Sequence, residues 1–416
     1  MKSLLSLLLT IVFLHSSPGY PLTYGGQVLD ALTNRPIKDA RVTLSDHQVV
    51  RTDANGVFQF EGGNHPIAVR ASGYRRGEPA VSPEEDKAYR IKLMPFTPKA
   101  LYLSFYGIGT KALRQPVLKL IEETELNALA IDIKGDRGMI AYQSSVPLAA
   151  EIGAQKISTI RDIHGLLRTL QGQGIYTIAR IVVFKDNPLA LARPDLAVKT
   201  RDGAIWRDRE GLAWTDPFSE EVWAYNIAVA EEAAQNGFDE IQFDYARFPD
   251  ARRLRFSEAN TQENRIKAIT GFFDEARKRL APYNVFLAAD IFGYVCWNLN
   301  DTDIGQKLEE LAPLLDYISP MLYPSGFQYG IPGYRNPVAH PYEIVSLSLK
   351  RAKERTGLPG VHFRPWLQAF RDYAFDGRPF TGREIRVQIR ATEDQGSHGW
   401  MLWNPRNIYS AEGLSK

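Results

Sequence analysis

Beyond residue 98, short apolar runs alternate with longer amphipathic stretches, which is the pattern of repeated strand–helix units. Each apolar run has about the length of one strand and is apolar on both faces, as strands of a buried parallel sheet are. Eight such strands predict an α/β fold that closes into a (β/α)8 or TIM barrel rather than an open sheet. The strands are predicted at Ala100–Tyr106, Leu126–Lys134, Ile175–Phe184, Phe238–Phe248, Asn284–Gly293, Asp316–Tyr323, Val361–Phe370 and Gly399–Asn404.

Amphipathic stretches with the helical period lie between these strands. The clearest are Arg114–Thr124, Ile160–Gln173, Glu220–Asn236, Asn264–Leu280 and Pro341–Thr356. Three of them are followed by a glycine, which suits the left-handed backbone at many helix ends: Gly174, Gly237 and Gly357. The barrel is therefore predicted to span residues 99–410.

Residues 22–95 show strand patterns only, and they are predicted to form a small all-β domain of six or seven strands. The tetrapeptide Asp53-Ala54-Asn55-Gly56 is typical of a tight turn between two of them. A short linker that begins and ends with proline, residues 95–98, separates this region from the barrel. The strands are expected at Gly25–Leu29, Ala40–Leu44, Val49–Thr52, Val57–Phe60, Ile67–Ala71 and Tyr89–Leu93.

Residues 1–19 have the features of a secretory signal peptide. Lys2 provides a positive charge, Leu4–Leu14 is an apolar run too short for a comfortable membrane span, and small residues for cleavage follow. The only cysteine is Cys296, so no disulfide can form within one chain. We therefore expect a bacterial periplasmic or secreted protein with no stable membrane span after cleavage. An uncleaved anchor is the alternative.

The composition is that of a soluble globular protein, and it narrows the range of partners. Of the 416 residues, 44% are hydrophobic and 24% are charged, and the formal net charge is +2. No basic run stands out, so nucleic acid is not predicted as a partner. The composition makes no prediction about the oligomeric state.

The most informative stretch is GFDEIQFDYARFPD, residues 237–250. Its apolar start predicts a buried strand, and Pro249 ends the strand because it has no N–H to donate. Asp244 stands among apolar neighbours near the C-terminal end of this strand. Burying an unpaired carboxylate costs several kcal/mol, so such a residue has either a partner or a chemical role. If the role is structural, Arg247 is the expected partner.

Two further strands each carry an isolated aspartate late in their length, Asp132 and Asp290. In a barrel these strand ends converge on one pocket, where like charges raise one another's pKa and can separate an acid from a base. We therefore predict a catalytic pair of Asp244 and Asp290. Other residues near the strand ends are predicted to bind substrate, the aromatic ones by stacking on sugar rings or, alternatively, by packing in the core: Asp132, Lys134, Arg180, Arg247, Tyr323, Trp366, Gln368 and Trp403.

Sequence patterns typical of several other enzyme classes are absent. The chain contains no HExxH or HxH motif for a metal, no glycine-rich phosphate loop and no GxSxG motif for a serine nucleophile. The acidic stretch Asn300-Asp301-Thr302-Asp303 is more typical of a turn and a helix cap than of a cation site. Neither a metal nor a cofactor is therefore predicted.

Two parts of the chain resemble known families. The segments GQVLDALTNRPIKDARVTL, RTDANGVFQF and AVRASGYR resemble the carboxypeptidase regulatory-like domain, a prealbumin-type β-sandwich that is usually an accessory module. From about residue 99 to residue 407, the segments NALAIDIKGDRG, GFDEIQFDYARFPD, AADIFGY and DYISPMLYPSGF resemble a bacterial family assigned to the glycoside hydrolases with a TIM-barrel fold. The second resemblance implies cleavage of a polysaccharide.

The resemblance also bears on the roles of individual carboxylates. Compared with amylase-type barrels, Asp244 matches the strand-four nucleophile, and Asp290 stands where that clan usually has a glutamate acid. The DxxDxDxE pattern of chitinase-type barrels is absent, so substrate-assisted cleavage is not supported. Gln368 stands where another retaining clan has its strand-seven glutamate nucleophile.

The leading hypothesis is a secreted or periplasmic glycoside hydrolase of a bacterial polysaccharide, with Asp244 as nucleophile and Asp290 as acid/base. Carboxylates at matching heights on neighbouring strands would be about 5 Å apart, as in retaining enzymes. Asp132 paired with Asp244 would span further and would predict inversion. The main alternative is a catalytically silent carbohydrate-binding barrel of the cell envelope, and a metal-dependent deacetylase is the third.

Overall fold

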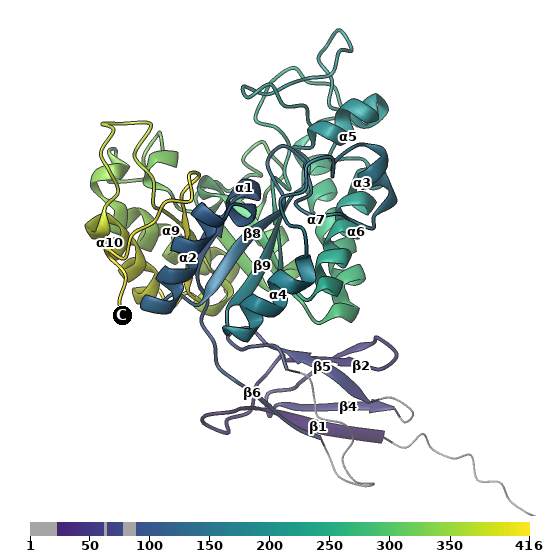
Figure 1. The fold of residues 1–416 in the computed structure, drawn as a ribbon, viewed down its shortest axis with the longest axis vertical. Coiled ribbons are helices and arrows are strands. Elements are labelled where there is room, and N and C mark those ends of the chain that lie inside the picture. The colour runs from purple at the N-terminus through teal and green to yellow at the C-terminus, as the bar shows by residue number, and fades with distance from the viewer. Residues whose placement is uncertain (1–22, 62–64, 78–88) are drawn as a thin grey trace, which may run out of the picture.

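The computed structural model describes residues 23–61, 65–77 and 89–416. It shows a small β-sandwich joined by a short linker to a large barrel (Figure 1). The predicted signal peptide, residues 1–19, lies outside the described residues. In the part of the chain that is described, no helix is long and apolar enough to cross a membrane.

The described residues of the N-terminal part form two three-stranded sheets, with the orders β4-β1-β6 and β3-β2-β5. The side chains between the sheets form a separate apolar core that includes Val28, Val42, Phe58 and Val69. This confirms the predicted all-β fold of the region. The strands are β1 (Thr23–Asp30), β2 (Arg41–Leu44), β3 (Val49–Arg51), β4 (Val57–Glu61), β5 (Pro66–Arg70) and β6 (Tyr89–Leu93).

The larger part is a closed barrel of eight parallel strands in the order β10-β11-β12-β13-β14-β7-β8-β9. Strands that follow one another along the chain are neighbours, and the last strand, β14, pairs with the first, β7. This confirms the predicted α/β fold, a TIM barrel preceded by a β-sandwich. The strands are β7 (Lys99–Leu103), β8 (Ala128–Lys134), β9 (Tyr176–Val182), β10 (Glu240–Asp244), β11 (Phe286–Phe292), β12 (Tyr317–Met321), β13 (Trp366–Gln368) and β14 (Trp400–Trp403).

Helices cover the outside of the barrel (Figure 1). Two of them, α6 (Glu220–Asn236) and α9 (Pro341–Thr356), have the predicted bounds, and each is ended by a glycine with left-handed backbone, Gly237 and Gly357. The other long helices are α2 (Lys111–Glu123), α4 (Ile163–Gly172), α7 (Gln262–Leu280) and α10 (Gly382–Asp394). Shorter ones are α1 (Phe105–Gly109), α3 (Pro147–Glu151), α5 (Asn187–Ala192) and α8 (Leu308–Leu311).

The barrel interior is filled with side chains, and a buried ion pair lies near the ends where the strands begin. Glu240, the first residue of β10, accepts hydrogen bonds from Nη2 of Arg364 at 2.7 Å and from the hydroxyl of Tyr176 at 3.0 Å. Neither charged side chain is exposed. Burial raises the pKa of Glu240 above its ordinary value, and the charge of Arg364 offsets only part of that rise.

The sandwich packs against the end of the barrel where the strands begin (Figure 1). Asp316, directly before β12, pairs with Arg41 of the sandwich at 2.7 Å. Asp239, directly before β10, pairs with Arg76 at 3.1 Å. The opposite end, where the strands finish and where TIM-barrel enzymes have their active sites, is therefore left open.

The buried Glu240–Arg364 pair provides a test of how the interior is stabilised. The substitution Arg364→Met leaves a buried carboxylate without its cation, so the free energy of unfolding at pH 7 should fall by about 3 kcal/mol. The loss should shrink toward pH 5, because a buried glutamate with a raised pKa becomes neutral as the pH falls. Urea denaturation at both pH values measures the two effects.

An exposed ion pair on α2 is the matched control for this experiment. Lys119 and Glu123 lie 3.6 Å apart, and both side chains are more than half exposed. Surface pairs of this kind contribute little, so Glu123→Gln should leave the unfolding curve almost unchanged. Equal losses from the two substitutions would contradict a special role for the buried pair.

Candidate active site

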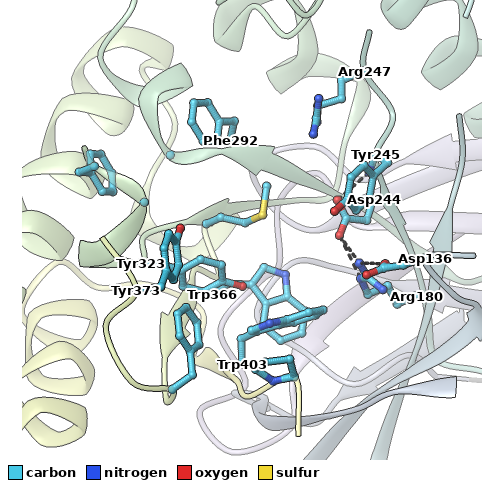
Figure 2. Close-up of a pocket in the computed structure, with 16 residues that line it drawn as sticks. Asp136, Arg180, Asp244, Tyr245, Arg247, Phe292, Tyr323, Trp366, Tyr373 and Trp403 are labelled. Carbon is cyan, nitrogen blue, oxygen red and sulfur yellow. Dashed lines mark hydrogen bonds and ion pairs between the residues drawn. The ribbon is translucent and has the colours of Figure 1, made fainter. Parts of the chain in front are cut away.

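A cleft of about 380 Å³ opens where the barrel strands finish, on the side away from the sandwich. Figure 2 shows carboxylate side chains gathered around Arg180 on one side and aromatic rings facing them from the other. The side chains come from the ends of several strands and from the loops that follow them. The lining includes Asp136, Arg180, Asp244, Tyr245, Arg247, Phe292, Tyr323, Trp366, Tyr373 and Trp403.

Arg180 is the centre of the site, and its buried guanidinium group contacts four aspartates. The shortest nitrogen–oxygen distances are 2.5 Å to Asp244, 2.6 Å to Asp132, 3.0 Å to Asp136 and 3.8 Å to Asp290. The aspartates come from β10, β8, the loop after β8, and β11. One buried cation thus faces four acidic side chains, so the group cannot hold all four negative charges without a large electrostatic cost.

Asp244 is the last residue of β10 and lines the cleft. Its Oδ2 accepts hydrogen bonds from Nε and Nη2 of Arg180 at 3.0 and 2.5 Å, and its Oδ1 accepts one from the backbone N–H of Tyr245 at 2.6 Å. The chain turns sharply at Tyr245, which has a positive φ of 50°. These contacts hold the Asp244 carboxylate in a defined orientation at the cleft wall.

Arg247 is not the partner of Asp244, so the structural pairing considered from sequence is wrong. Its guanidinium group lies 5.0 Å from the ring centre of Tyr245 and 5.1 Å from that of Trp214, and Nη1 donates a hydrogen bond to the carbonyl of Phe248. The turn at Tyr245 sends the following residues away from the strand. Arg247 nevertheless lines the cleft, where it is free to contact a ligand at the rim.

Asp290 lies deeper than Asp244, with only 1% of its surface exposed, and it is not part of the cleft wall. Its Oδ1 accepts a hydrogen bond from Nε1 of Trp366 at 2.7 Å. Its Oδ2 is buried and has no hydrogen-bond partner among the described residues. Burial and then the negative charge of Asp244 raise the pKa of Asp290 well above its ordinary value. Both effects favour the protonated form of Asp290.

Asp132 lies on the other side of Arg180 and faces a second cleft of about 220 Å³. Its Oδ2 accepts hydrogen bonds from the hydroxyl of Tyr102 at 2.6 Å and from the N–H of Phe105 at 3.2 Å. Burial raises its pKa to about 6, although Arg180 acts in the opposite direction. The two clefts share Asp136, Trp403 and Pro405, so they lie side by side, and we refer to the pair as the groove.

Three of the predicted aromatic residues, Tyr323, Trp366 and Trp403, line the cleft. Trp403 stacks on Tyr102 with ring centres 3.8 Å apart, and the guanidinium group of Arg180 lies 4.9 Å from its ring centre. Trp366 packs edge-on against both Tyr102 and Trp403. The rings thus serve as packing around Arg180 and as walls of the cleft.

Two predicted substrate-binding residues do not lie with the others. Lys134 is fully buried, with Nζ 2.7 Å from Asp186 and 3.0 Å from Asn226 of α6. The strand register shifts between Asp132 and Lys134, so the extra residue, Ile133, turns the lysine away from the face of Asp132. Gln368 is also fully buried, and its amide exchanges hydrogen bonds with Ser325 at 3.0 and 2.7 Å. Neither side chain lines the cleft, so the structure brings neither of them to the predicted site.

Sequence reasoning left Asp136 out of the predicted site, although it belongs to the carboxylate group. Asp136 follows β8 by two residues, its side chain is 39% exposed, and it lines both clefts. A carboxylate directly after a strand that already carries Asp132 is the signal that points to it. Tyr102, the partner of both Asp132 and Trp403, was also missed because an aromatic residue within an apolar strand is most often core.

Within residues 23–61, 65–77 and 89–416, no three His, Cys, Asp or Glu side chains are arranged as metal ligands. The four aspartates instead use their oxygens on Arg180 and on neighbouring hydrogen-bond donors.

Residues 100–409 match the family model described as "Putative glycosyl hydrolase domain", which covers more than half of the chain. Residues 24–94 match the carboxypeptidase regulatory-like domain. No protein with curated annotation matches the chain.

Three solved structures are similar to this chain. A hypothetical protein from Ruminiclostridium thermocellum is 39% identical, with 46% of this chain and 96% of that one covered and a TM-score of 0.42. The PgaB (BpsB) glycoside hydrolase domain from Bordetella bronchiseptica is 15% identical, with 76% and 95% covered and a TM-score of 0.53. A β-galactosidase from the psychrophilic Marinomonas ef1 is 12% identical, with 73% and 54% covered and a TM-score of 0.53.

At 15% and 12% identity, the last two structures show a likeness of fold alone. The family models are more specific, because they match the sequence itself over both parts of the chain. This confirms the two family resemblances found in the sequence. The chain belongs to the family described as "Putative glycosyl hydrolase domain", and a carboxypeptidase regulatory-like domain precedes its barrel.

Proposed function

We propose that the protein hydrolyses glycosidic bonds of a bacterial polysaccharide in the groove at the open end of the barrel. The position of Asp244 supports this most strongly. It is a carboxylate at the end of a barrel strand, on the wall of an open cleft, and a buried arginine and a backbone N–H hold it in place. An anion held in this way has the orientation that attack on a sugar carbon requires.

Glycoside hydrolysis also needs an acid, because the leaving sugar oxygen has to receive a proton. We assign this role to Asp290, because burial and the nearby charge of Asp244 raise its pKa and favour its protonated form. The oxygens of both aspartates lie within 3.8 Å of the same nitrogen, Nε of Arg180. The two aspartates also lie on the paired neighbouring strands β10 and β11, and from this placement we infer retention of configuration rather than inversion.

Asp136 is the competing candidate for the acid, since access to the substrate favours it. It lies on the wall of the groove, whereas Trp366 stands between Asp290 and the cleft. For Asp290 to act as the acid, the Trp366 side chain has to move when substrate binds. Substituting Asp290 and Asp136 one at a time shows which of the two is the acid.

The groove suits a chain of several sugars. Phe292 and Tyr373 present partly exposed rings at the cleft, and Tyr106 does so at the adjoining one. Aromatic faces pack against the apolar faces of sugar rings, while Arg247 at the rim and Asp132 in the floor can bind hydroxyl groups. Because the two clefts meet at Asp136 and Trp403, an extended polysaccharide can cross the carboxylates from one side to the other.

We further propose that the protein is exported to the periplasm or the medium, where such a polysaccharide is found. The signal-peptide pattern of residues 1–19 is the support for this step. A catalytically silent barrel that only binds envelope glycan is the alternative, and the activity measurements below decide between the two.

The substitution Asp244→Asn should reduce hydrolysis by at least about three orders of magnitude, because it removes the proposed nucleophile and keeps the shape of the side chain. Release of reducing ends from bacterial exopolysaccharides and cell-wall glycans measures the effect. Asp250→Asn, an exposed position of the same sequence motif, is the matched control and should retain full activity. Turnover that survives Asp244→Asn in a folded protein excludes this residue as nucleophile, and glycan binding without turnover by the wild type supports the silent barrel.

Comparing Asp290→Asn with Asp136→Asn identifies the acid. If Asp290 is the acid, its substitution should lower kcat on polysaccharide by about 10²–10⁴ and remove the alkaline limb of the pH–rate profile. Activity on an aryl glycoside with a good leaving group should fall much less, since that bond needs no proton. Asp136→Asn should keep the alkaline limb. The reverse pattern would assign the acid to Asp136.

Asp132 makes the stability of the barrel depend on pH. Its pKa is about 6 in the folded protein against an ordinary value of 3.8, so between these values the folded chain keeps a proton that the unfolded chain has lost. The free energy of unfolding should therefore fall by about 3 kcal/mol as the pH rises from 4 to 7. Asp132→Asn removes this titration, so the free energy of unfolding of the variant, measured by urea denaturation, should fall by about 3 kcal/mol less over the same pH range. Parallel curves for the two proteins would contradict the raised pKa.

A further inference from the structure

We propose that a cleft between the sandwich and the closed end of the barrel is a second ligand site, which binds a phosphate group. The cleft has a volume of about 600 Å³ and lies at the opposite end of the barrel from the proposed active site. Both parts of the chain line it, the sandwich with Arg41, Arg51 and Arg70, and the barrel with Asp316 and His362.

Positive charge exceeds negative charge around this cleft. Three arginines come from neighbouring strands of one sheet: Arg41 from β2, Arg51 from β3 and Arg70 from β5. Arg277 of α7 lies nearby, and its pKa is lowered first by burial and then by the charges of Arg41 and Arg51. The carboxylate facing them is Asp316, 2.7 Å from Nη1 of Arg41 and 3.8 Å from Nε of Arg70.

The remaining charged side chains of the cleft do not remove this excess. Lys38 and Asp39 pair with each other at 3.7 Å, and both are more than half exposed. His362 uses its Nδ1 on the carbonyl oxygen of Asp316 at 3.1 Å. Among the described residues, the three arginines that line the cleft therefore share one carboxylate, Asp316.

Arg70 has two buried donor groups without hydrogen-bond partners in the described chain, although Asp316 lies at ion-pair distance. The Arg70 side chain is only 5% exposed, and the two donor groups are Nε and Nη1. Buried donors without partners are rare in proteins, because leaving such a group unpaired away from water is unfavourable. Burial and the neighbouring arginines also lower the pKa of Arg70 to about 10, while Asp316 acts in the opposite direction. A second anion at this position would relieve the repulsion and supply acceptors.

Phosphate is the group that fits best. Arginine presents a planar set of donors that binds the oxygens of phosphate or carboxylate in pairs. The cleft has two cations in excess of its carboxylates, which favours a doubly charged group over a single carboxylate. The cleft is larger than a phosphate ion and has an apolar wall that includes Leu315, Leu358, Pro359 and Val361. This wall gives room for a sugar or other group that carries the phosphate.

Binding of the full chain to inorganic phosphate, measured by calorimetry at constant ionic strength, tests the site. We expect saturable binding in the range of about 1 mM or tighter. Arg70→Gln should weaken it at least fivefold, and Arg51→Gln, an exposed position on the cleft, at least threefold. Arg76→Gln removes an interface arginine that pairs with Asp239 away from the cleft, so it is the matched control and should bind normally.

The outcomes are distinct. Absence of saturable binding up to about 20 mM, or equal binding by wild type and Arg51→Gln, would overturn the proposal. The Arg51 variant keeps the test valid if Arg70→Gln does not fold. Tighter binding of glucose 1-phosphate than of inorganic phosphate would assign the site to phosphorylated sugars, and equal binding would assign it to the free ion. If galacturonate binds more tightly than inorganic phosphate and glucose 1-phosphate, the assignment to phosphate is overturned.

Discussion

One buried arginine determines the electrostatics of the barrel's open end. Arg180 lies in the middle of β9 and is 1% exposed, and four aspartates from three strands and one loop surround it. A single cation cannot balance four anions in a site from which water is largely excluded, so protons have to stay on some of the carboxyl groups. Burial affects the carboxyl groups to different extents. It raises the pKa values of Asp290 and Asp132, whereas Asp244 has the shortest contact with Arg180. For the proposed hydrolase, this difference in depth would separate an acid from a base with no need for residues of different type.

The two ends of the barrel deal with buried charge in different ways. At the end where the strands begin, Glu240 and Arg364 form a closed pair without exposure to solvent, and the sandwich covers that end. At the other end, the charges of Arg180 and its aspartates border an open groove. Apolar side chains such as Ala128, Ile178 and Ala288 fill the interior between them. This filling separates the two charge clusters in space, but the negative charge of Glu240 still contributes to the raised pKa of Asp290.

Much of this architecture could be predicted from the sequence, because it follows from local patterns. The eight apolar runs predicted the eight strands, and Asp244, Asp290, Asp132 and Arg180 stood out because single charges in apolar strands are costly. The failures have local causes of another kind. A bulge at Ile133 turns the side chain of Lys134 to the other face of its strand. A turn at Tyr245 directs Arg247 away from Asp244. The backbone N–H of Ser325, in the loop after β12, donates a hydrogen bond to Gln368. None of these backbone events leaves a hydrophobic pattern, and Asp136 was missed because loops have no period at all.

The position of the sandwich limits what it can contribute to the proposed hydrolysis. It contacts Gly174, Asp239 and Asp316, which lie just before β9, β10 and β12 at the far end of a filled barrel. None of the described side chains of the sandwich therefore lies near the groove. A phosphate group in the cleft beside Arg70 would likewise remain remote from Asp244. Its effect would be to strengthen the domain contact, because the site uses cations from the sandwich and an apolar wall from the barrel, and a ligand that binds only the assembled site stabilises it. If the polysaccharide itself carries phosphate, one chain could be held at the closed end and cleaved at the open end, and the sandwich would then act through local concentration of substrate.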